Sequence, residues 1–273
     1  MKKQDFRLAV CFGAISALGP LALDMYLAAM PIISAELNAA EGQIEHSVMA
    51  FFIGFCLGQL VLGPVSDRTG RKPVVLLGLC LFTLASVGCL LASSVEMLTA
   101  WRFVQGIGGS VGMVIAMASI RDLYTGAMAG KLMALVVMVL GLAPIIAPVM
   151  GSAILTVAPW QAIFALLAIV SAGIFVAVCA FLPETRAAEA RALSRPSRTL
   201  GTYARLLVTG NYVPYAAAMA LSQGGFFGFI SVASIVLMGH YELSAFAFSL
   251  VFGSTALGLM VTSQIGGALV GRL

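Results

Sequence analysis

The sequence predicts an all-α protein that crosses a membrane several times. Of its 273 residues, 61% are apolar and only 10% are charged, whereas about a quarter of the residues in a soluble domain are charged. The mean hydropathy of +1.05 agrees with this assignment. The apolar residues gather in runs of about 20, which is the length a helix needs to cross roughly 30 Å of hydrocarbon.

Eight apolar runs reach this length. They cover residues 7–32, 46–66, 73–93, 97–120, 131–157, 160–182, 211–238 and 244–270. Lys2 and Lys3 before the first run could mark a cleavable signal peptide, but this run is too long for the apolar core of such a peptide and contains Asp24. We therefore expect eight transmembrane helices.

The basic residues predict the orientation of these helices. If the eight runs alternate in direction, every Lys and Arg outside the fourth run falls on one side: Lys2, Lys3, Arg7, Arg68, Arg71, Lys72, Arg121, Lys131, the basic residues of 186–205, and Arg272. The opposite loops contain no Lys or Arg, only the acids Glu36, Glu41, Glu45, Glu96 and Glu242. Since basic residues concentrate in cytoplasmic loops, we expect the N-terminus in the cytoplasm. We call the two sides the basic end and the acidic end.

One long polar segment separates six runs from two. We expect residues 1–182 to form a six-helix bundle, 183–210 a cytoplasmic linker, and 211–273 the first two helices of a second bundle. Residues 63–68 and 267–272 share a Gly and an Arg at the same offset, a weak sign of the internal repeat that many secondary transporters have. The sequence thus favours a piece of a protein of about twelve spans that cannot transport by itself. A natural eight-span protein is the alternative.

The loop between the second and third runs reads GPVSDRTGRK. Gly63 would let a neighbouring helix approach and Gly70 would supply a tight turn, whereas Asp67 needs a cation or a helix N-terminus nearby. A hairpin with basic anchors explains the bases but not this acid. The loop matches G-x-x-x-D-R-x-G-R-[RK] and resembles the signature of the major facilitator superfamily, which implies the major facilitator fold.

The fourth run begins TAWRFVQGIGGSVG and ends IRDLY. Arg102, Gln105 and Gly109 recur at helical spacing, and we expect their shared face to point inward because an arginine facing lipid costs at least about 2.5 kcal/mol. The run resembles the superfamily pattern R-x-x-Q-G-x-G, whose arginine is associated with proton transfer. The resemblance also implies a cytoplasmic gate formed by Gly63, Asp67, Arg68, Gly70, Arg71 and Asp122. An ordinary helix end is the alternative for Asp122.

The fifth run contains GLAPIIAPVMGS at 141–152. Pro144 and Pro148 remove backbone donors and favour a kink, while small residues permit close packing of a neighbouring helix, namely Gly141, Ala147 and Gly151. The segment resembles the antiporter signature of drug-exporting facilitators, although Ala147 and Ser152 replace two of its glycines. It therefore favours antiport.

The first run ends DMYLAAMP at 24–31. This segment resembles the D-x-Y-L-P-A-x-P run of the bicyclomycin-resistance branch of drug:proton antiporters, with Ala28 where that branch commonly has proline. The resemblance covers essentially the whole chain. It implies a transporter of the bacterial inner membrane, monomeric when complete, that exports small amphipathic compounds in exchange for protons.

Two ionisable residues inside the predicted spans are candidates for proton coupling. Asp24 and Arg102 lie at similar depths, about 12 Å and about 8 Å from the acidic end. A carboxyl in a low-dielectric cavity is harder to ionise, and a nearby guanidinium makes ionisation easier. We therefore hypothesise that a change in solvent access moves a proton on or off Asp24. A cap or hydrogen bond near the outer interface is the alternative role for this residue.

Substrate contacts are less well defined by the sequence. We expect an apolar cavity with a few polar groups, for which the candidates are Tyr26, Gln59, Gln105, Met113, Gln223 and Phe226. Packing against other helices or lipid is the alternative for each.

No pattern in the sequence predicts an enzyme, a cofactor, a metal site or a nucleic-acid partner. The two histidines are isolated, and neither a Gly-x-Ser-x-Gly turn nor a nucleotide phosphate loop occurs. The five cysteines lie in apolar runs, and we expect them to be buried thiols rather than disulfides. The remaining alternatives are a solute:proton symporter of the same superfamily and a membrane protein that does not transport.

Overall fold

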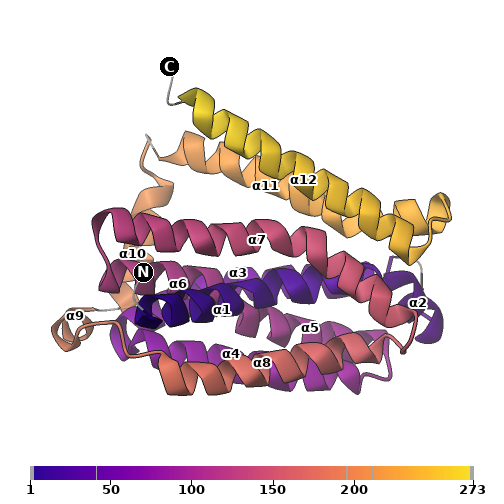
Figure 1. The fold of residues 1–273 in the computed structure, drawn as a ribbon, viewed down its shortest axis with the longest axis horizontal. Helices are drawn as coiled ribbons and strands as arrows, with labels where there is room; N and C mark the ends of the chain where they lie inside the picture. Colours follow the sequence, from indigo (N-terminus) through magenta and orange to yellow (C-terminus); the bar gives the residue numbers. More distant parts are fainter. Residues whose placement is uncertain (1–2, 41, 195, 211, 271–273) are drawn as a thin grey trace.

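The computed structural model describes residues 3–40, 42–194, 196–210 and 212–270, and the regular elements of these residues are all helices (Figure 1). In chain order they are α1 (Lys3–Leu27), α2 (Met30–Glu36), α3 (Glu45–Thr69), α4 (Arg71–Leu90), α5 (Val95–Gly109), α6 (Val111–Leu123), α7 (Gly126–Leu155), α8 (Gln161–Phe181), α9 (Ala188–Leu193), α10 (Pro196–Leu207), α11 (Val213–Ser234), the π-helix η1 (Ile235–His240) and α12 (Ala245–Val270). The all-α prediction is confirmed.

Seven helical segments of the described chain are long and apolar enough to cross a membrane. They are Asp5–Leu27, Glu45–Thr69, Arg71–Leu90, Val95–Leu123, Gly126–Leu155, Gln161–Phe181 and Val213–His240. The eighth predicted span falls on α12, in which the apolar segment Ala245–Leu259 is shorter than the other seven. The repeat suggested for 267–272 extends beyond the described residues. The protein is therefore a multi-pass membrane protein.

The first predicted span is too long at its acidic end. The helix ends at Leu27 and a new helix, α2, begins at Met30 with Pro31 in its first turn, a position where the missing N–H of proline is not needed. Ala29 donates its backbone N–H to the carbonyl of Tyr26 and so closes the turn between the two helices. The predicted continuous run 7–32 was wrong in this respect.

The fourth span, formed by α5 and α6, is the centre of the six-helix packing because glycines let three neighbours approach its backbone. A Cβ at Gly106 would lie 2.1 Å from the Phe51 carbonyl oxygen of α3, and one at Gly108 would lie 2.5 Å from a backbone nitrogen of α4. A Cβ at Gly112 would lie 2.5 Å from the Ile15 carbonyl oxygen of α1. Small residues at helix interfaces allow this closeness in membranes, where van der Waals packing holds helices together.

Of the last two long helices, α12 lies beside α7 and α11 contacts α3; both diverge from the bundle toward the end where the N-terminus lies (Figure 1). At the acidic end the Ser234 hydroxyl donates to the Met30 sulfur over 3.5 Å, and the Phe52 and Phe227 rings are 4.6 Å apart. The first six spans and the pair α11–α12 are thus in contact at the acidic end and separate toward the basic end.

The cysteines only partly match the prediction of buried thiols. All five are free, but Cys56, Cys80 and Cys179 are exposed on the outer faces of their helices, and only Cys11 and Cys89 are buried. An apolar run does not specify which of its residues face the membrane, so the sequence could not separate the two groups.

Candidate functional site

Arg102 lies at the centre of a buried polar cluster in the six-helix bundle. Its side chain has no exposed surface, and its Nη1 donates to the Ala22 carbonyl oxygen over 3.0 Å and to Gln105 Oε1 over 2.7 Å. Gln105 in turn donates its Nε2 to the Ser86 hydroxyl over 2.8 Å. Arg102 and Gln105 are about one turn apart on α5, and this spacing makes the hydrogen bond between their side chains possible. We call Arg102, Ala22, Gln105 and Ser86, together with Tyr26 and Phe51, the Arg102 cluster.

Two aromatic rings enclose the guanidinium of Arg102. Its central carbon is 4.5 Å from the centre of the Tyr26 ring and 4.4 Å from that of Phe51, within the range of a cation–π interaction. The Tyr26 hydroxyl is 2.6 Å from that of Ser47, which donates to the Ile44 carbonyl oxygen. The Tyr26 hydroxyl therefore acts as the donor to Ser47.

The charge of Arg102 is not neutralised within the described part of the chain. No carboxylate forms an ion pair with it, and its Nε and Nη2 have no hydrogen-bond partner there. A buried charge without a counter-ion is costly, and the aromatic rings offset only part of this cost.

Asp24 does not contact Arg102. It is 2% exposed, and none of the described residues forms an ion pair or hydrogen bond with its carboxyl. Asp24 lies about three turns from Gly13 on α1, so the two share a face, and a Cβ at Gly13 would lie 3.3 Å from Val139 of α7. Ala22 and Tyr26, which touch Arg102, are on a different face. The two ionisable residues thus lie on opposite sides of α1.

Asp24 lies beside the part of α7 that follows its two prolines. Helices α1 and α7 run side by side, since a Cβ at Gly151 would lie 2.6 Å from the Met25 carbonyl oxygen, and Asp24 is therefore level with the turn that follows Pro148. On the other side of α7, the Ser249 hydroxyl of α12 donates to the Pro148 carbonyl oxygen over 2.8 Å. Both Pro144 and Pro148 lie inside one continuous helix.

The loop at 63–72 forms a network of charges at the basic end. Arg71 is 5% exposed and contacts Asp67 over 2.8 Å, Asp122 over 2.9 Å and the Ser66 hydroxyl over 2.6 Å. Arg68 is exposed, and no ion pair with it is found among the described residues. The structure thus brings together three of the charged residues expected at the gate and leaves one outside.

Two further residues of this network were not predicted from the sequence, because residues 183–210 were expected to form only a linker. Arg186 contacts Asp122 over 3.4 Å and Asp67 over 3.8 Å. Glu184 accepts hydrogen bonds from the backbone N–H groups of Arg71 and Lys72, the first two residues of α4, and so caps this helix. Their position directly after the sixth span, at the end where the loop lies, was the available signal.

The two glycines of this loop differ in their surroundings. Gly70 has φ +111°, a conformation that favours glycine, and a Cβ there would lie 2.3 Å from Glu184 Oε2. At Gly63 a Cβ would meet only the Val114 side chain, at an ordinary 3.8 Å. The tight turn at Gly70 is present, but the close helix approach expected at Gly63 is not.

Comparison with known proteins identifies the family. Residues 12–273 match the model of the family described as "Major Facilitator Superfamily". The chain belongs to the major facilitator superfamily. It is thus related to membrane transporters rather than to enzymes.

Relatives within this superfamily include drug-resistance proteins. The chain is 34% identical to "Uncharacterized MFS-type transporter YdgK" of Bacillus subtilis, over 97% of this chain and 66% of the relative. It is 31% identical to "Bicyclomycin resistance protein homolog" of Haemophilus influenzae, over 100% and 68%, and 32% identical to "Multidrug resistance protein MdtL" of Escherichia coli O81, over 95% and 70%. The chain spans about two thirds of the length of these curated relatives. The resemblance to the bicyclomycin-resistance branch is confirmed.

Solved structures confirm the major facilitator fold. A bacterial homologue of the human lysosomal transporter Spinster, in an inward-facing and unoccupied conformation, superposes with a TM-score of 0.75 at 16% identity, over 100% of this chain and 64% of that one. The human organic anion transporter MFSD10 gives 0.68 at 18% identity, over 93% and 70%.

The residues expected to line a substrate cavity of this facilitator are dispersed. Tyr26 and Gln105 are fully buried in the Arg102 cluster, whereas Met113 is 44% exposed. Gln223 is exposed on α11, and Gln59 and Phe226 are half-buried. Of the six candidates, only Tyr26 and Gln105 lie together in the described structure.

Proposed function

We propose that the complete gene product exports small amphipathic compounds across the bacterial inner membrane in exchange for protons. The observation that carries this proposal is the pair of buried ionisable residues on opposite sides of α1, Asp24 and Arg102, neither of which has an ion-pair partner in the described part of the chain. Charged groups inside membrane spans are rare and mark ion or substrate pathways. The names of relatives, bicyclomycin and multidrug resistance proteins, support drugs as the substrate class.

In this mechanism Asp24 carries the proton. An ionised carboxyl without a partner is costly to bury, so Asp24 holds its proton in the arrangement described above. Because Asp24 lies beside the Pro148 turn of α7, a change in the bend of α7 would change its access to water. Release of the proton then follows when Asp24 reaches water.

The arrangement of the helices supports alternating access with the basic end on the cytoplasmic side. We infer that residues 1–182 form one bundle, 183–210 the linker, and 211–273 the start of a second bundle. Since α11 and α12 diverge from α7 at the basic end (Figure 1), this arrangement corresponds to a transporter open to the cytoplasm. The network of Asp67, Arg71 and Asp122 then stabilises the cytoplasmic ends of α3, α4 and α6.

An efflux measurement in cells tests this function. Bacteria that lack their own exporters and express the complete gene product should lose preloaded ethidium and survive bicyclomycin better than cells without it. The variant Asp24→Asn should abolish both effects. Glu96→Gln is the matched control, because its carboxyl already accepts a bond from Gln43 at the acidic end. Unchanged export by Asp24→Asn would contradict the proposed role of the carboxyl.

A further inference from the structure

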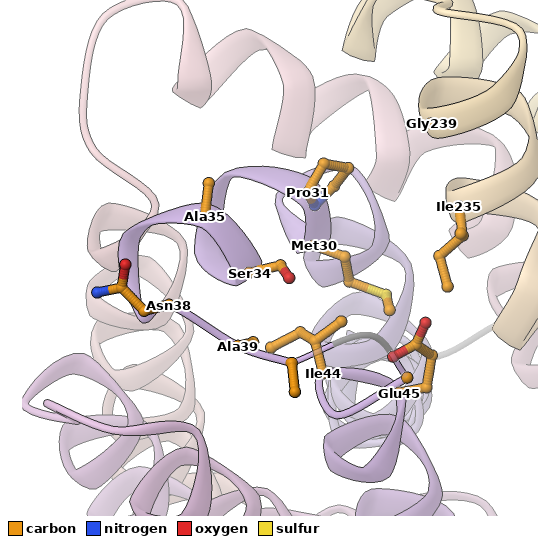
Figure 2. Close-up of a pocket in the computed structure, with 12 residues that line it drawn as sticks. Met30, Pro31, Ser34, Ala35, Asn38, Ala39, Ile44, Glu45, Ile235 and Gly239 are labelled. Carbon is orange, nitrogen blue, oxygen red and sulfur yellow. The ribbon is translucent and has the colours of Figure 1, made fainter.

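The two ends of the molecule differ in the charges that they offer to a ligand. At the acidic end, a cavity of about 430 Å³ between α2 and η1 is lined by Glu45 and by no Lys or Arg of the described chain (Figure 2). At the basic end, Arg71 and Arg186 form ion pairs within the charge network, whereas Arg7 and Lys72 lie outside it. Positive charge that could attract an anion is therefore found at the basic end.

Arg7 and Lys72 are both held against the last turn of α8. The guanidinium of Arg7, on α1, lies over the Phe181 ring, with 5.4 Å between its central carbon and the ring centre. The Nζ of Lys72, on α4, donates to the Cys179 carbonyl oxygen over 2.9 Å. Since α8 packs against both α1 and α4, two neighbouring helices bring one cation each to the same helix end.

Neither of these cations is neutralised by a carboxylate in the part of the chain that the structure describes. The carboxylate of Glu184 accepts from the backbone N–H of Lys72, not from its amine. A lysine amine has three donors, and the Cys179 carbonyl uses one of those of Lys72. The Arg7 guanidinium covers the Phe181 ring with its face, so its N–H groups, which lie in its plane, remain available for an oxygen anion.

The surface beside the two cations is apolar and accessible. Val176 and Phe181 of α8 are 66% and 51% exposed, and Val10, one turn beyond Arg7 on α1, is 53% exposed. In a protein that spans a membrane, such side chains at the outside of the bundle meet lipid. A phosphate ion would contact the cations but would leave this apolar surface uncovered. An anion that carries hydrocarbon chains matches both parts of the surface.

We propose that an anionic phospholipid binds at this end of α8, with its phosphate against Arg7 and Lys72 and its acyl chains along Val10 and Val176. Basic residues next to membrane spans attract anionic lipids, and basic pockets between spans bind their headgroups. The bound lipid connects α1 with α4 beside Arg71, where the charge network begins. The site requires neither export nor proton coupling, so its failure and that of the proposed function are distinguishable.

A native thiol reports on this site. Cys179 is exposed at this end of α8, whereas Cys56 is exposed on α3 and serves as the internal control. The purified protein in detergent is treated with N-ethylmaleimide, and the alkylation rate of each cysteine is measured by peptide mass spectrometry. Dioleoyl phosphatidylglycerol should slow the alkylation of Cys179 relative to Cys56 at a concentration at least about fivefold lower than dioleoyl phosphatidylcholine requires.

The two lipids have the same acyl chains and differ in net charge, so equal protection of Cys179 by both would overturn the proposal. Glycerol phosphate carries the anion without the chains and should not protect Cys179 at the same concentration. Protection by glycerol phosphate equal to that by phosphatidylglycerol would assign the site to a free phosphate and would also overturn the proposal.

Three variants locate the headgroup. Arg7→Gln and Lys72→Gln should each raise the concentration of phosphatidylglycerol needed for half-protection of Cys179 by about fivefold. Arg121→Gln removes an exposed charge of the same end from α6 and should behave like the parent protein. If Lys72→Gln does not fold, Arg7→Gln decides, because the Arg7 side chain is exposed. Unchanged protection in a folded Arg7 or Lys72 variant, or an equal loss with Arg121→Gln, refutes the site.

Discussion

Replacing Gly70 by alanine should destabilise the protein through two separate contacts. The backbone at Gly70 has φ +111° and ψ 158°, a region that residues with a Cβ rarely adopt, and such strain costs about 1–3 kcal/mol. A Cβ there would also lie 2.3 Å from Glu184 Oε2 and would displace the carboxylate that caps α4. Because Glu184 is partly exposed, we discount the loss of its charge-assisted bonds to about 1 kcal/mol. The expected total loss of unfolding free energy is about 2–4 kcal/mol.

Gly63→Ala provides the matched control within the same loop. A Cβ at Gly63 meets only the Val114 side chain at 3.8 Å, so this substitution should change the unfolding free energy by less than about 0.5 kcal/mol. Both variants can be measured by chemical unfolding in mixed micelles. If Gly63→Ala lost as much stability as Gly70→Ala, or if neither lost any, the reasoning from backbone conformation and contact would be refuted.

A double-mutant cycle separates the two effects at Gly70. Glu184→Ala alone should lose the cap, and in the double variant the alanine at 70 no longer meets a carboxylate. The combined loss should therefore be smaller than the sum of the single losses, with an interaction energy of about 1 kcal/mol. Strict additivity would mean that backbone strain alone explains the need for glycine.

Three further predictions concern other parts of the structure. Gly106→Ala should cost about 1–3 kcal/mol because its Cβ meets rigid backbone at 2.1 Å, while Gly130→Ala, with nothing within 4 Å, should be neutral or slightly stabilising; equal stability of the two would contradict the packing described for α5. Arg71→Ala should lower the unfolding free energy by about 2–4 kcal/mol, and Arg71→Lys should restore only part of it, since lysine cannot hold both carboxylates; full rescue by lysine would argue against the network. Burial and the hydrogen bond to Asp5 raise the pKa of Tyr124 to about 12, so the unfolded chain releases this proton first and stability should fall between about pH 10 and 12. Tyr124→Phe should remove that part of the loss, and an identical pH dependence of unfolding would exclude the contribution.

The sequence predicted the helices well because membrane helices must satisfy their backbone groups internally and must be long and apolar. The prediction failed where the continuity of a helix depends on local backbone geometry. The break between α1 and α2 lies at Ala28 and Ala29, although alanine has a high intrinsic helix propensity. The sequence placed Asp24 and Arg102 at similar depths, but it could not show which face of its helix each residue occupies, and the structure places the two on opposite sides of α1.

The charge network shows a similar limit. The signature loop predicted Asp67, Arg71 and Asp122 as neighbours, and the structure brings them together. The contributions of Glu184 and Arg186 depend on how the chain turns after α8, which a polar segment does not encode in any periodic pattern. Those contacts required the three-dimensional arrangement.

Proton movement driven by substrate is the most direct test of the central claim. Proteoliposomes that contain the complete gene product and a trapped pH dye should show a pH change when ethidium is added on one side, and the change should be absent with Asp24→Asn. The same variant should still exchange labelled for unlabelled ethidium across the membrane, because exchange at equilibrium requires no net proton transfer. Ethidium transport without any pH change in the parent protein, or a normal pH change with Asp24→Asn, would contradict proton coupling through this carboxyl.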